Sequence, residues 1–267
     1  MNTMKIQKWL SLAYAKLKES GVVSFQLDGL ILLEHVTGFD KACILAHQDE
    51  ELSNKQILEL SKLLSRRCKR EPIAYITSKK EFYGREFIAN KNVLIPRPES
   101  ESFIDLLKKH NITYQKIADI GCGSGILGIS AKLELPTNTV TLTDIDYKAL
   151  IVAENNAKNL GAKCNIVQSD LKPTDNDYTV ILANLPYVPQ ELKLEPELNY
   201  EPKIALYAKN HGMEIYDRLW QQIHTSKNIR YVLTESLVAQ HKAMIKLAEP
   251  DFKLIDTDGL VQLFSKN

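Results

Sequence analysis

The sequence lacks the signatures of several large classes of protein. Its cysteines form no C-x-x-C pair and its histidines show no H-E-x-x-H spacing, so no metal site is expected. No apolar run reaches the roughly 18 residues typical of a membrane span, and no secretory signal precedes the cysteines. Lys plus Arg number 34 against 33 for Asp plus Glu, so no net field favours nucleic acid or an anionic membrane. We therefore expect a cytoplasmic monomer, free of membranes and without direct nucleic-acid binding.

The first part of the chain has the apolar spacing of helices. At 267 residues the chain is long enough for a large and a small domain. From Ile6 to about Arg70, apolar residues recur every three or four positions. Ser53 is a suitable N-cap for the last helix, and Gly21 and Gly38 end earlier ones. The pattern predicts a helical-bundle domain over residues 1–72.

A short extended segment is predicted to follow. From Ile73 to Ile95 the pattern indicates strands, and Gly84 in "FYGREF" marks the turn between two of them. The prolines of "IPRPES" end this hairpin and open a new segment. We predict a β-hairpin linker over residues 73–98.

The remainder, residues 99–267, alternates short aliphatic runs with helical ones. Such alternation predicts an α/β domain with a mainly parallel sheet covered on both faces. The last two strands are separated only by Asp258 and Gly259, so they should pair antiparallel as a hairpin. The expected strands are "KIADI", "TVTLTDI", "NIVQSD", "YTVILANL", "RYVLTES", "FKLIDT" and "LVQLFSK", and the expected helices are Leu127 to Leu133, Lys148 to Asn159 and Met213 to Ile223.

A glycine-rich loop lies between the first of these strands and its helix. Gly121, Gly123 and Gly125 allow a tight bend and the close approach of a ligand. Asp144 ends the next strand, about twenty residues further on, where an acid can accept hydrogen bonds from ribose hydroxyls. Asp170, at the end of the third strand, could reach an adenine edge. Without the dinucleotide fingerprint or a Walker lysine, a nucleoside without phosphates is the better ligand.

The loop also has a purely structural explanation. Tight turns contain glycines with no ligand, and acids often cap helices. Asp146 is predicted to do only that, ahead of the helix from Lys148. Cys122 is predicted to be a small filler rather than a nucleophile, because no histidine lies near it in sequence.

The fourth strand runs into Asn184-Leu185-Pro186-Tyr187 at the same edge of the sheet. Pro186 restricts Leu185 to an extended conformation, so the Leu185 carbonyl has a set direction. With the Asn184 side-chain oxygen it offers two acceptors for the hydrogens of one NH₂ group, and Tyr187 could stack on a planar group. These features predict methyl transfer to a conjugated nitrogen. The structural alternative is a strand that ends in a proline turn, with Tyr187 as packing.

These motifs resemble those of known methyltransferases. The D-x-G-x-G-x-G loop is similar to that of S-adenosylmethionine-dependent methyltransferases. Asn-Pro-Pro-Tyr is the signature of enzymes that methylate planar NH₂ groups, either adenine N6 or glutamine N5. Here Leu185 replaces the first proline, and Asn-Leu-Pro-Tyr is also similar to the motif of ribosomal-RNA adenine dimethyltransferases. The tetrapeptide therefore does not choose between amide and adenine.

The region upstream of the glycine loop discriminates between an amide and an adenine substrate. "REPIAYITSKKEFYGREFIANKNVLIPRPESE" closely resembles the hairpin of the bacterial release factor glutamine methyltransferases, which typically ends in I-P-R-P-E-T-E. Ser100 replaces the threonine, while Pro98-Glu99 favours the release-factor branch over the ribosomal-protein branch. "YEPKIALYAKNHGMEIYDRL" and the helical first 70 residues also match, so the resemblance covers nearly the whole chain.

The resemblance implies a fold, a cofactor and a substrate. The fold is a Rossmann-like class I methyltransferase sheet behind a helical domain that recognises the substrate. The implied substrate is the glutamine of the Gly-Gly-Gln loop in class I peptide chain release factors, and the implied benefit is efficient translation termination. The cofactor is S-adenosyl-L-methionine, with binding residues Gly121, Cys122, Gly123, Ser124, Gly125, Asp144, Asp170, Leu171 and Asn184, and catalytic residues Asn184, Leu185, Pro186 and Tyr187.

Two other functions stay open at this point. An adenine N6-methyltransferase on RNA or DNA would need a basic docking face. The densest basic cluster is Arg66, Arg67, Lys69 and Arg70, which is typical of a solvated helix C-terminus. A cofactor-binding adaptor without catalysis is the non-enzymatic alternative, motivated by Leu185.

Overall fold

The computed structural model describes residues 3–173, 177–192 and 195–267. The chain divides into two compact units. One contains residues 1–78 and Glu195–Tyr200, and the other contains Lys79–Leu194 and Glu201–Asn267. The helical unit thus extends to Ser78, beyond the predicted boundary at 72, and takes in a second piece of chain.

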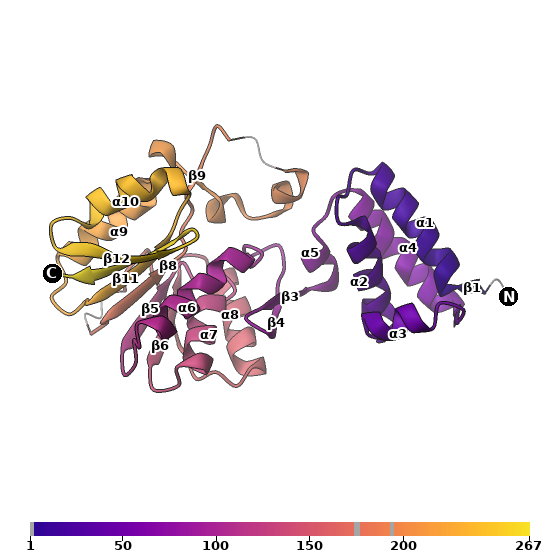
Figure 1. Cartoon of the computed structure of the whole chain (residues 1–267), viewed down its shortest axis with the longest axis horizontal. Coiled ribbons are helices and arrows are strands. Elements are labelled where there is room, and N and C mark those ends of the chain that lie inside the picture. The colour runs from indigo at the N-terminus through magenta and orange to yellow at the C-terminus, as the bar shows by residue number, and fades with distance from the viewer. Residues whose placement is uncertain (1–2, 174–176, 193–194) are drawn as a thin grey trace. The chain divides into compact units, whose positions relative to one another are not determined.

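The helical unit is built on three helices that contact one another, α1, α2 and α4 (Figure 1). Ser53 caps α4 in a capping box with Gln56, and Gly38 ends α2 in the left-handed conformation, as the sequence predicts. Leu60, Leu63 and Leu64 of α4 are buried at helical spacing. The elements of this unit are β1 (Met4–Lys5), α1 (Ile6–Glu19), α2 (Phe25–Thr37), α3 (Lys41–Ala46), β2 (Glu51–Leu52), α4 (Asn54–Cys68), α5 (Ile73–Thr77) and the 3-10 helix η2 (Pro196–Tyr200).

The basic cluster at the end of α4 is not the solvated helix end that the sequence predicts. The Arg67 side chain is only 6% exposed and donates to Asp28 at 2.7 Å and to Glu197 at 3.0 Å. Arg70 forms a bidentate pair with Glu197. Because carboxylates already neutralise these guanidinium groups, they offer little charge to a nucleic-acid backbone.

The extended prediction from Ile73 onward is wrong for its first residues. Ile73–Thr77 forms the short helix α5, in which Tyr75 and Ile76 are buried and the Thr77 hydroxyl donates to the Ile73 carbonyl. The predicted hairpin follows it. β3 (Lys79–Phe82) and β4 (Arg85–Ile88) pair antiparallel around a turn in which Tyr83 and Gly84 have positive φ.

The larger unit is an α/β sheet domain, which confirms the predicted fold class. In the described residues the sheet has the order β12-β13-β11-β8-β5-β6-β7, parallel from β11 to β7. β13 pairs antiparallel with β12, as the short turn after Asp258 requires, and also antiparallel with β11. The strands are β5 (Lys116–Ile120), β6 (Thr139–Asp144), β7 (Asn165–Gln168), β8 (Val180–Ala183), β11 (Tyr231–Glu235), β12 (Phe252–Asp258) and β13 (Val261–Lys266).

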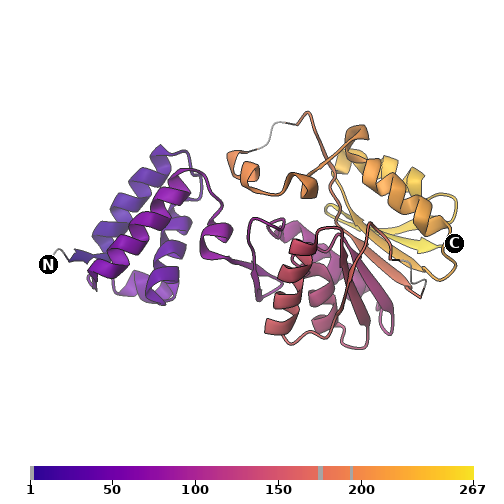
Figure 2. The same ribbon diagram turned by 180° about the vertical axis from the view of Figure 1, so that it is seen from behind.

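Helices cover both faces of this sheet (Figures 1 and 2). One face packs against α6 (Ser102–Lys109), α7 (Ile126–Glu134) and α8 (Tyr147–Asn159). The other packs against α9 (Glu214–His224) and α10 (His241–Ala248), with Trp220 at the centre of that core. The sequence did not single out α6 or α10. The remaining short elements are η1 (Pro98–Glu101), β9 (Val188–Pro189), η3 (Lys203–Ala205), β10 (Tyr207–Ala208), η4 (Asn210–Gly212) and η5 (Val238–Gln240).

No helix among the described residues is both long and apolar enough to cross a bilayer.

Candidate active site

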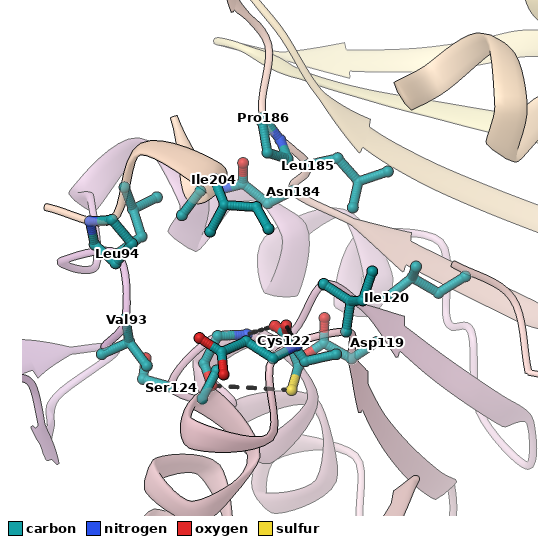
Figure 3. A pocket seen from close by; sticks show the side chains of 18 of the residues that line it. Val93, Leu94, Asp119, Ile120, Cys122, Ser124, Asn184, Leu185, Pro186 and Ile204 are labelled. Atoms are coloured by element: carbon teal, nitrogen blue, oxygen red, sulfur yellow. Dashed lines mark hydrogen bonds between the residues drawn. The ribbon is translucent and has the colours of Figure 1, made fainter. Parts of the chain in front are cut away.

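The candidate site is a cavity of about 250 Å³ at the carboxyl ends of the parallel strands. Because β5, β6 and β8 run in the same direction, the residues that follow them meet at one edge. Figure 3 shows Asn184, Leu185 and Pro186 across the cavity from Cys122 and Ser124 of the glycine loop. Of the predicted site residues, the lining contains Gly121, Cys122, Gly123, Ser124, Asp144, Asp170, Leu171, Asn184, Leu185 and Pro186.

The glycine loop has the left-handed backbone that its residues predict. Gly121 and Gly123 have φ of 66° and 55°. A side chain at Gly121 would place its Cβ 2.7 Å from Cδ2 of Leu185, so the loop and the tetrapeptide are in direct contact. Burial raises the pKa of the Cys122 thiol well above its ordinary value, which agrees with a filler rather than a nucleophile.

Three N–H groups of the loop, those of Cys122, Gly123 and Gly125, already donate to acceptors within the chain. The Cys122 N–H donates to the Thr143 carbonyl, and the Gly123 N–H to the Asp144 carboxylate. At the start of α7 the Gly128 N–H donates to Asp119, whose pKa burial raises to about 7. An anion-binding loop would aim such N–H groups at its ligand. This loop therefore suits a ligand without phosphates.

Asp144 is held so that its carboxylate borders the cavity. It accepts the Gly123 N–H at 2.9 Å on one oxygen and the Asp146 N–H at 2.9 Å on the other. Burial raises the pKa of Asp144, while these backbone hydrogen bonds lower it. Each oxygen keeps a lone pair for a hydroxyl group. Asp146 caps α8 through the Lys148 N–H, as predicted, but it also lines the cavity.

Two other predicted residues border the cavity with different surroundings. Asp170 forms an exposed ion pair with Arg218 at 2.6 Å, so a ligand would compete with that arginine for the carboxylate. Leu171 is buried, and its φ of 64° is unusual for a residue other than glycine.

Gly125 and Tyr187 are absent from the lining among the residues that the structure describes. Gly125, with φ of 80°, begins α7, and a side chain there would meet Ile129 at 2.9 Å. Its role is therefore close packing beneath the loop. The Tyr187 hydroxyl donates to Oε1 of Glu235 at 2.9 Å, which anchors the ring outside the cavity wall.

Asn184 lies in a chain of hydrogen bonds that the sequence analysis did not identify. Its Nδ2 donates to Oγ of Ser100 at 3.0 Å, and the Ser100 hydroxyl donates to Oε2 of Glu235 at 2.6 Å. Ser100 and Glu235 are each only 1% exposed. Burial raises the pKa of Glu235, and the hydrogen bonds from Ser100, Tyr187 and Asn184 lower it. This chain fixes the side chain of Asn184 against the sheet.

Leu185 is fixed by its backbone. Its N–H donates to the Tyr216 hydroxyl at 3.1 Å, and that hydroxyl donates to the Glu235 carbonyl at 2.6 Å. Leu185 is 4% exposed and packs with the core on the α9 and α10 side. The side chain and the main chain of Glu235 thus hold neighbouring residues of the tetrapeptide.

The chain matches a curated release factor glutamine methyltransferase of Mycoplasma mycoides subsp. mycoides. The two are 34% identical over 236 residues, which cover 82% of each chain. The chain belongs to the release factor glutamine methyltransferase family. Residues 8–77 match the PrmC N-terminal domain and residues 98–200 the methyltransferase small domain. The resemblance drawn from the sequence motifs is confirmed.

Some relatives of this chain are longer than the chain itself. A bifunctional methyltransferase of Rickettsia typhi is 37% identical over 238 residues, which are 79% of this chain and 46% of the relative. The chain therefore spans about half the length of this group of curated relatives. A solved structure titled methyltransferase from Pyrococcus furiosus has a TM-score of 0.51 at 16% identity, covering 80% of this chain and 99% of that one. That likeness supports the sheet fold alone.

The family motifs are also joined to one another in space. Glu201, from the "YEPKIAL" segment, accepts the Ile95 N–H at 3.0 Å and Nη2 of Arg97 at 2.6 Å. It thereby holds the "IPRPES" segment, which carries Ser100. In the sequence, Ser100 is marked as a possible site residue by its place in "IPRPES". Glu235 is marked only by being the acid of "LTES" at the end of a predicted strand. No group of three or more His, Cys, Asp or Glu in the described part of the chain could hold a metal ion.

Proposed function

We propose that the protein transfers a methyl group to the side-chain amide nitrogen N5 of a glutamine, using S-adenosyl-L-methionine. The substrate is the Gly-Gly-Gln motif of class I peptide chain release factors, and the consequence is support of translation termination. The observation that carries the proposal is the hydrogen bond from Asn184 Nδ2 to Ser100 Oγ. It leaves the Asn184 oxygen as the atom free to accept from a ligand NH₂. Family membership supports the choice of glutamine.

The residues of the cavity fit this cofactor. When bound, S-adenosyl-L-methionine supplies an electrophilic methyl group on a positively charged sulfur. Asp144 would accept hydrogen bonds from the ribose hydroxyls. Gly121 and Gly123, which have no side chain, would let the ligand approach the backbone closely. Cys122, Ser124, Leu171 and Asp170 would complete the binding site.

The acceptor side of the site needs no strong base. The Asn184 oxygen and the Leu185 carbonyl would each accept one hydrogen of the glutamine NH₂. Two such acceptors orient the nitrogen and stabilise the positive charge that develops on it. Alignment of the two reactants can supply up to about 7–11 kcal/mol of the barrier reduction. Tyr187, anchored on Glu235, would limit the movement of the amide plane rather than form the cavity wall.

The decisive experiment uses the whole protein, the labelled cofactor and a recombinant release factor. Mass spectrometry of the tryptic peptide should show one added methyl group on the Gly-Gly-Gln glutamine. A release factor with that glutamine replaced by alanine is the matched control and should gain no label. Total RNA is offered in a parallel reaction. Label in RNA alone would overturn the proposal in favour of an adenine methyltransferase, and cofactor binding without transfer to any release factor would favour an adaptor.

The helical unit is assigned the recognition of the release factor, because the sheet unit contains the whole cavity. We further propose that the protein works in the cytoplasm as a monomer, without direct contact to nucleic acid. The paired arginines at the end of α4 support the last point. Light scattering in solution tests the monomeric state, and a gel-shift measurement with RNA tests the absence of nucleic-acid contact.

A further inference from the structure

The hydrogen bonds around Glu235 have a defined direction. A carboxylate accepts hydrogen bonds and donates none, so the hydroxyls of Ser100 and Tyr187 must both point their protons at it. Ser100 has a single hydroxyl proton, and it is committed to Glu235. Oγ of Ser100 can therefore act only as an acceptor toward Asn184.

This direction determines which end of the Asn184 amide faces the cavity. The oxygen and nitrogen of an amide have nearly the same shape, and hydrogen-bond partners decide between the two orientations. Only Nδ2 can donate to the Ser100 oxygen, which lies 3.0 Å away. The Asn184 oxygen is thereby left for a ligand. In the reverse orientation the cavity would present a donor and would suit a carboxylate instead of an amide.

We propose that Glu235 and Ser100 are positioning residues that set the orientation of the Asn184 amide, so that the site accepts a primary carboxamide and rejects a carboxylate. The inference rests on the proposed function for its substrate, and on the buried chain Asn184, Ser100, Glu235 for its geometry. The main chain of Glu235 makes a second contribution through Tyr216, which binds the Leu185 N–H. Glu235 thus supports both Asn184 and Leu185, the two residues that offer acceptors to the substrate NH₂ group.

The first test compares substitutions at Ser100. Ser100→Ala removes the Oγ acceptor of Nδ2 and leaves it the Glu235 carboxylate, so kcat should fall on the order of 10-fold, as expected for the loss of one supporting hydrogen bond. Cofactor affinity should stay within about twofold. Ser100→Thr keeps the hydroxyl and should recover most of the lost activity. Ser130→Ala is the matched control, since Ser130 is fully buried in α7 and its hydroxyl has no partner among the described residues.

The second test uses pH at saturating cofactor. Protonation of Glu235 adds a donor, so Ser100 no longer has to accept from Asn184, and kcat should fall as the pH drops through the pKa of Glu235. The titratable groups near the Glu235 carboxylate are Glu99 from η1 and Tyr187 after β8, beside its hydrogen-bond donors Ser100 and Asn184. Tyr216 from α9 contacts the main-chain carbonyl of Glu235. The acidic limb should disappear in Glu235→Gln, which does not titrate. A limb that persists unchanged would overturn the role of Glu235.

The third test needs no substrate and separates the inference from the proposed function. The side-chain NH₂ signal of Asn184, assigned by its loss in Asn184→Asp, is followed by nuclear magnetic resonance. It should shift in Ser100→Ala and keep nearly its wild-type position in Ser100→Thr. An unchanged signal in Ser100→Ala would overturn the inference. If the release factor is not methylated at all, the proposed function is wrong, and this signal alone decides the positioning role.

Discussion

The backbone N–H of Leu185 donates to the hydroxyl of Tyr216 at 3.1 Å. Proline has no N–H, so the Asn-Pro-Pro-Tyr wording of related methyltransferases could not form this bond. Tyr216 is fully buried and also binds the Glu235 carbonyl at 2.6 Å. Leu185, which replaces the first proline of the family motif, thus has a defined hydrogen-bond partner in Tyr216 of α9.

Leu185→Pro should destabilise the protein by about 1–2 kcal/mol, because the buried Tyr216 hydroxyl loses a donor. Chemical denaturation measures the change. In a Tyr216→Phe background the same substitution should cost clearly less, since the hydrogen bond is already absent. Equal costs in both backgrounds would show that the bond contributes nothing to stability.

Gly121→Ala should destabilise the sheet unit by about 1–3 kcal/mol, because its Cβ would stand 2.7 Å from Cδ2 of Leu185. Gly161→Ala is the control. Gly161 has a similar φ of 68°, but no described atom lies within 4 Å of a Cβ built there. Thermal unfolding of both variants separates the clash from the backbone strain. The excess cost at Gly121 should shrink in a Leu185→Ala background, and an unchanged excess would mean that another contact is responsible.

Asn184→Ala should reduce kcat for methyl transfer by about 100-fold or more, because it removes an acceptor aimed at the charge that develops on nitrogen. Its cofactor affinity, measured by titration calorimetry, should change little.

Asp144→Ala provides the opposite phenotype for comparison. It removes a carboxylate that borders the cavity and supports Gly123, so cofactor binding should weaken by roughly 10-fold or more. The two role assignments would be reversed if Asn184→Ala weakened cofactor binding while Asp144→Ala kept its cofactor affinity and lowered kcat.

Asp119 should make stability depend on pH. Burial raises its pKa from 3.8 in the unfolded chain to about 7 in the folded protein. The folded state therefore holds this proton more tightly, and the stability it contributes is complete below about pH 4 and lost as the pH rises to about 7. Asp119→Asn keeps an acceptor oxygen for the Gly128 N–H and does not titrate. Its free energy of unfolding, measured by chemical denaturation, should vary less with pH over this window than that of the wild-type protein.

Much of the sheet unit follows from local pattern. "KIADI" matches β5 residue for residue, and the turn at Gly259 places β12 beside β13 as expected. Tertiary packing overrides the pattern at Ile73–Thr77, where β-branched and aromatic residues indicate a strand but burial of Tyr75 and Ile76 favours a helix. Short amphipathic segments such as α6 carry too few turns to stand out in the sequence.

The sequence predicts those site residues that belong to a recognisable motif at the end of a strand. The glycine loop, Asp144 and Asn184 each stand at a strand end, and parallel strands bring such ends together. The partners of Asn184 do not follow that rule. Ser100 and Glu235 are separated by 135 positions, and Tyr216 reaches Leu185 from α9. No local spacing connects such residues, because the tertiary fold alone joins them.

The pairing of Glu197 with Arg67 and Arg70 makes the helical unit discontinuous in the gene. A fragment that ends at residue 78 contains every long helix of that unit but lacks the Glu195–Tyr200 piece. It would leave Asp28 as the carboxylate bound to the buried Arg67. An exchange of residues 1–78 alone between two relatives would therefore separate Arg67 and Arg70 from their own Glu197.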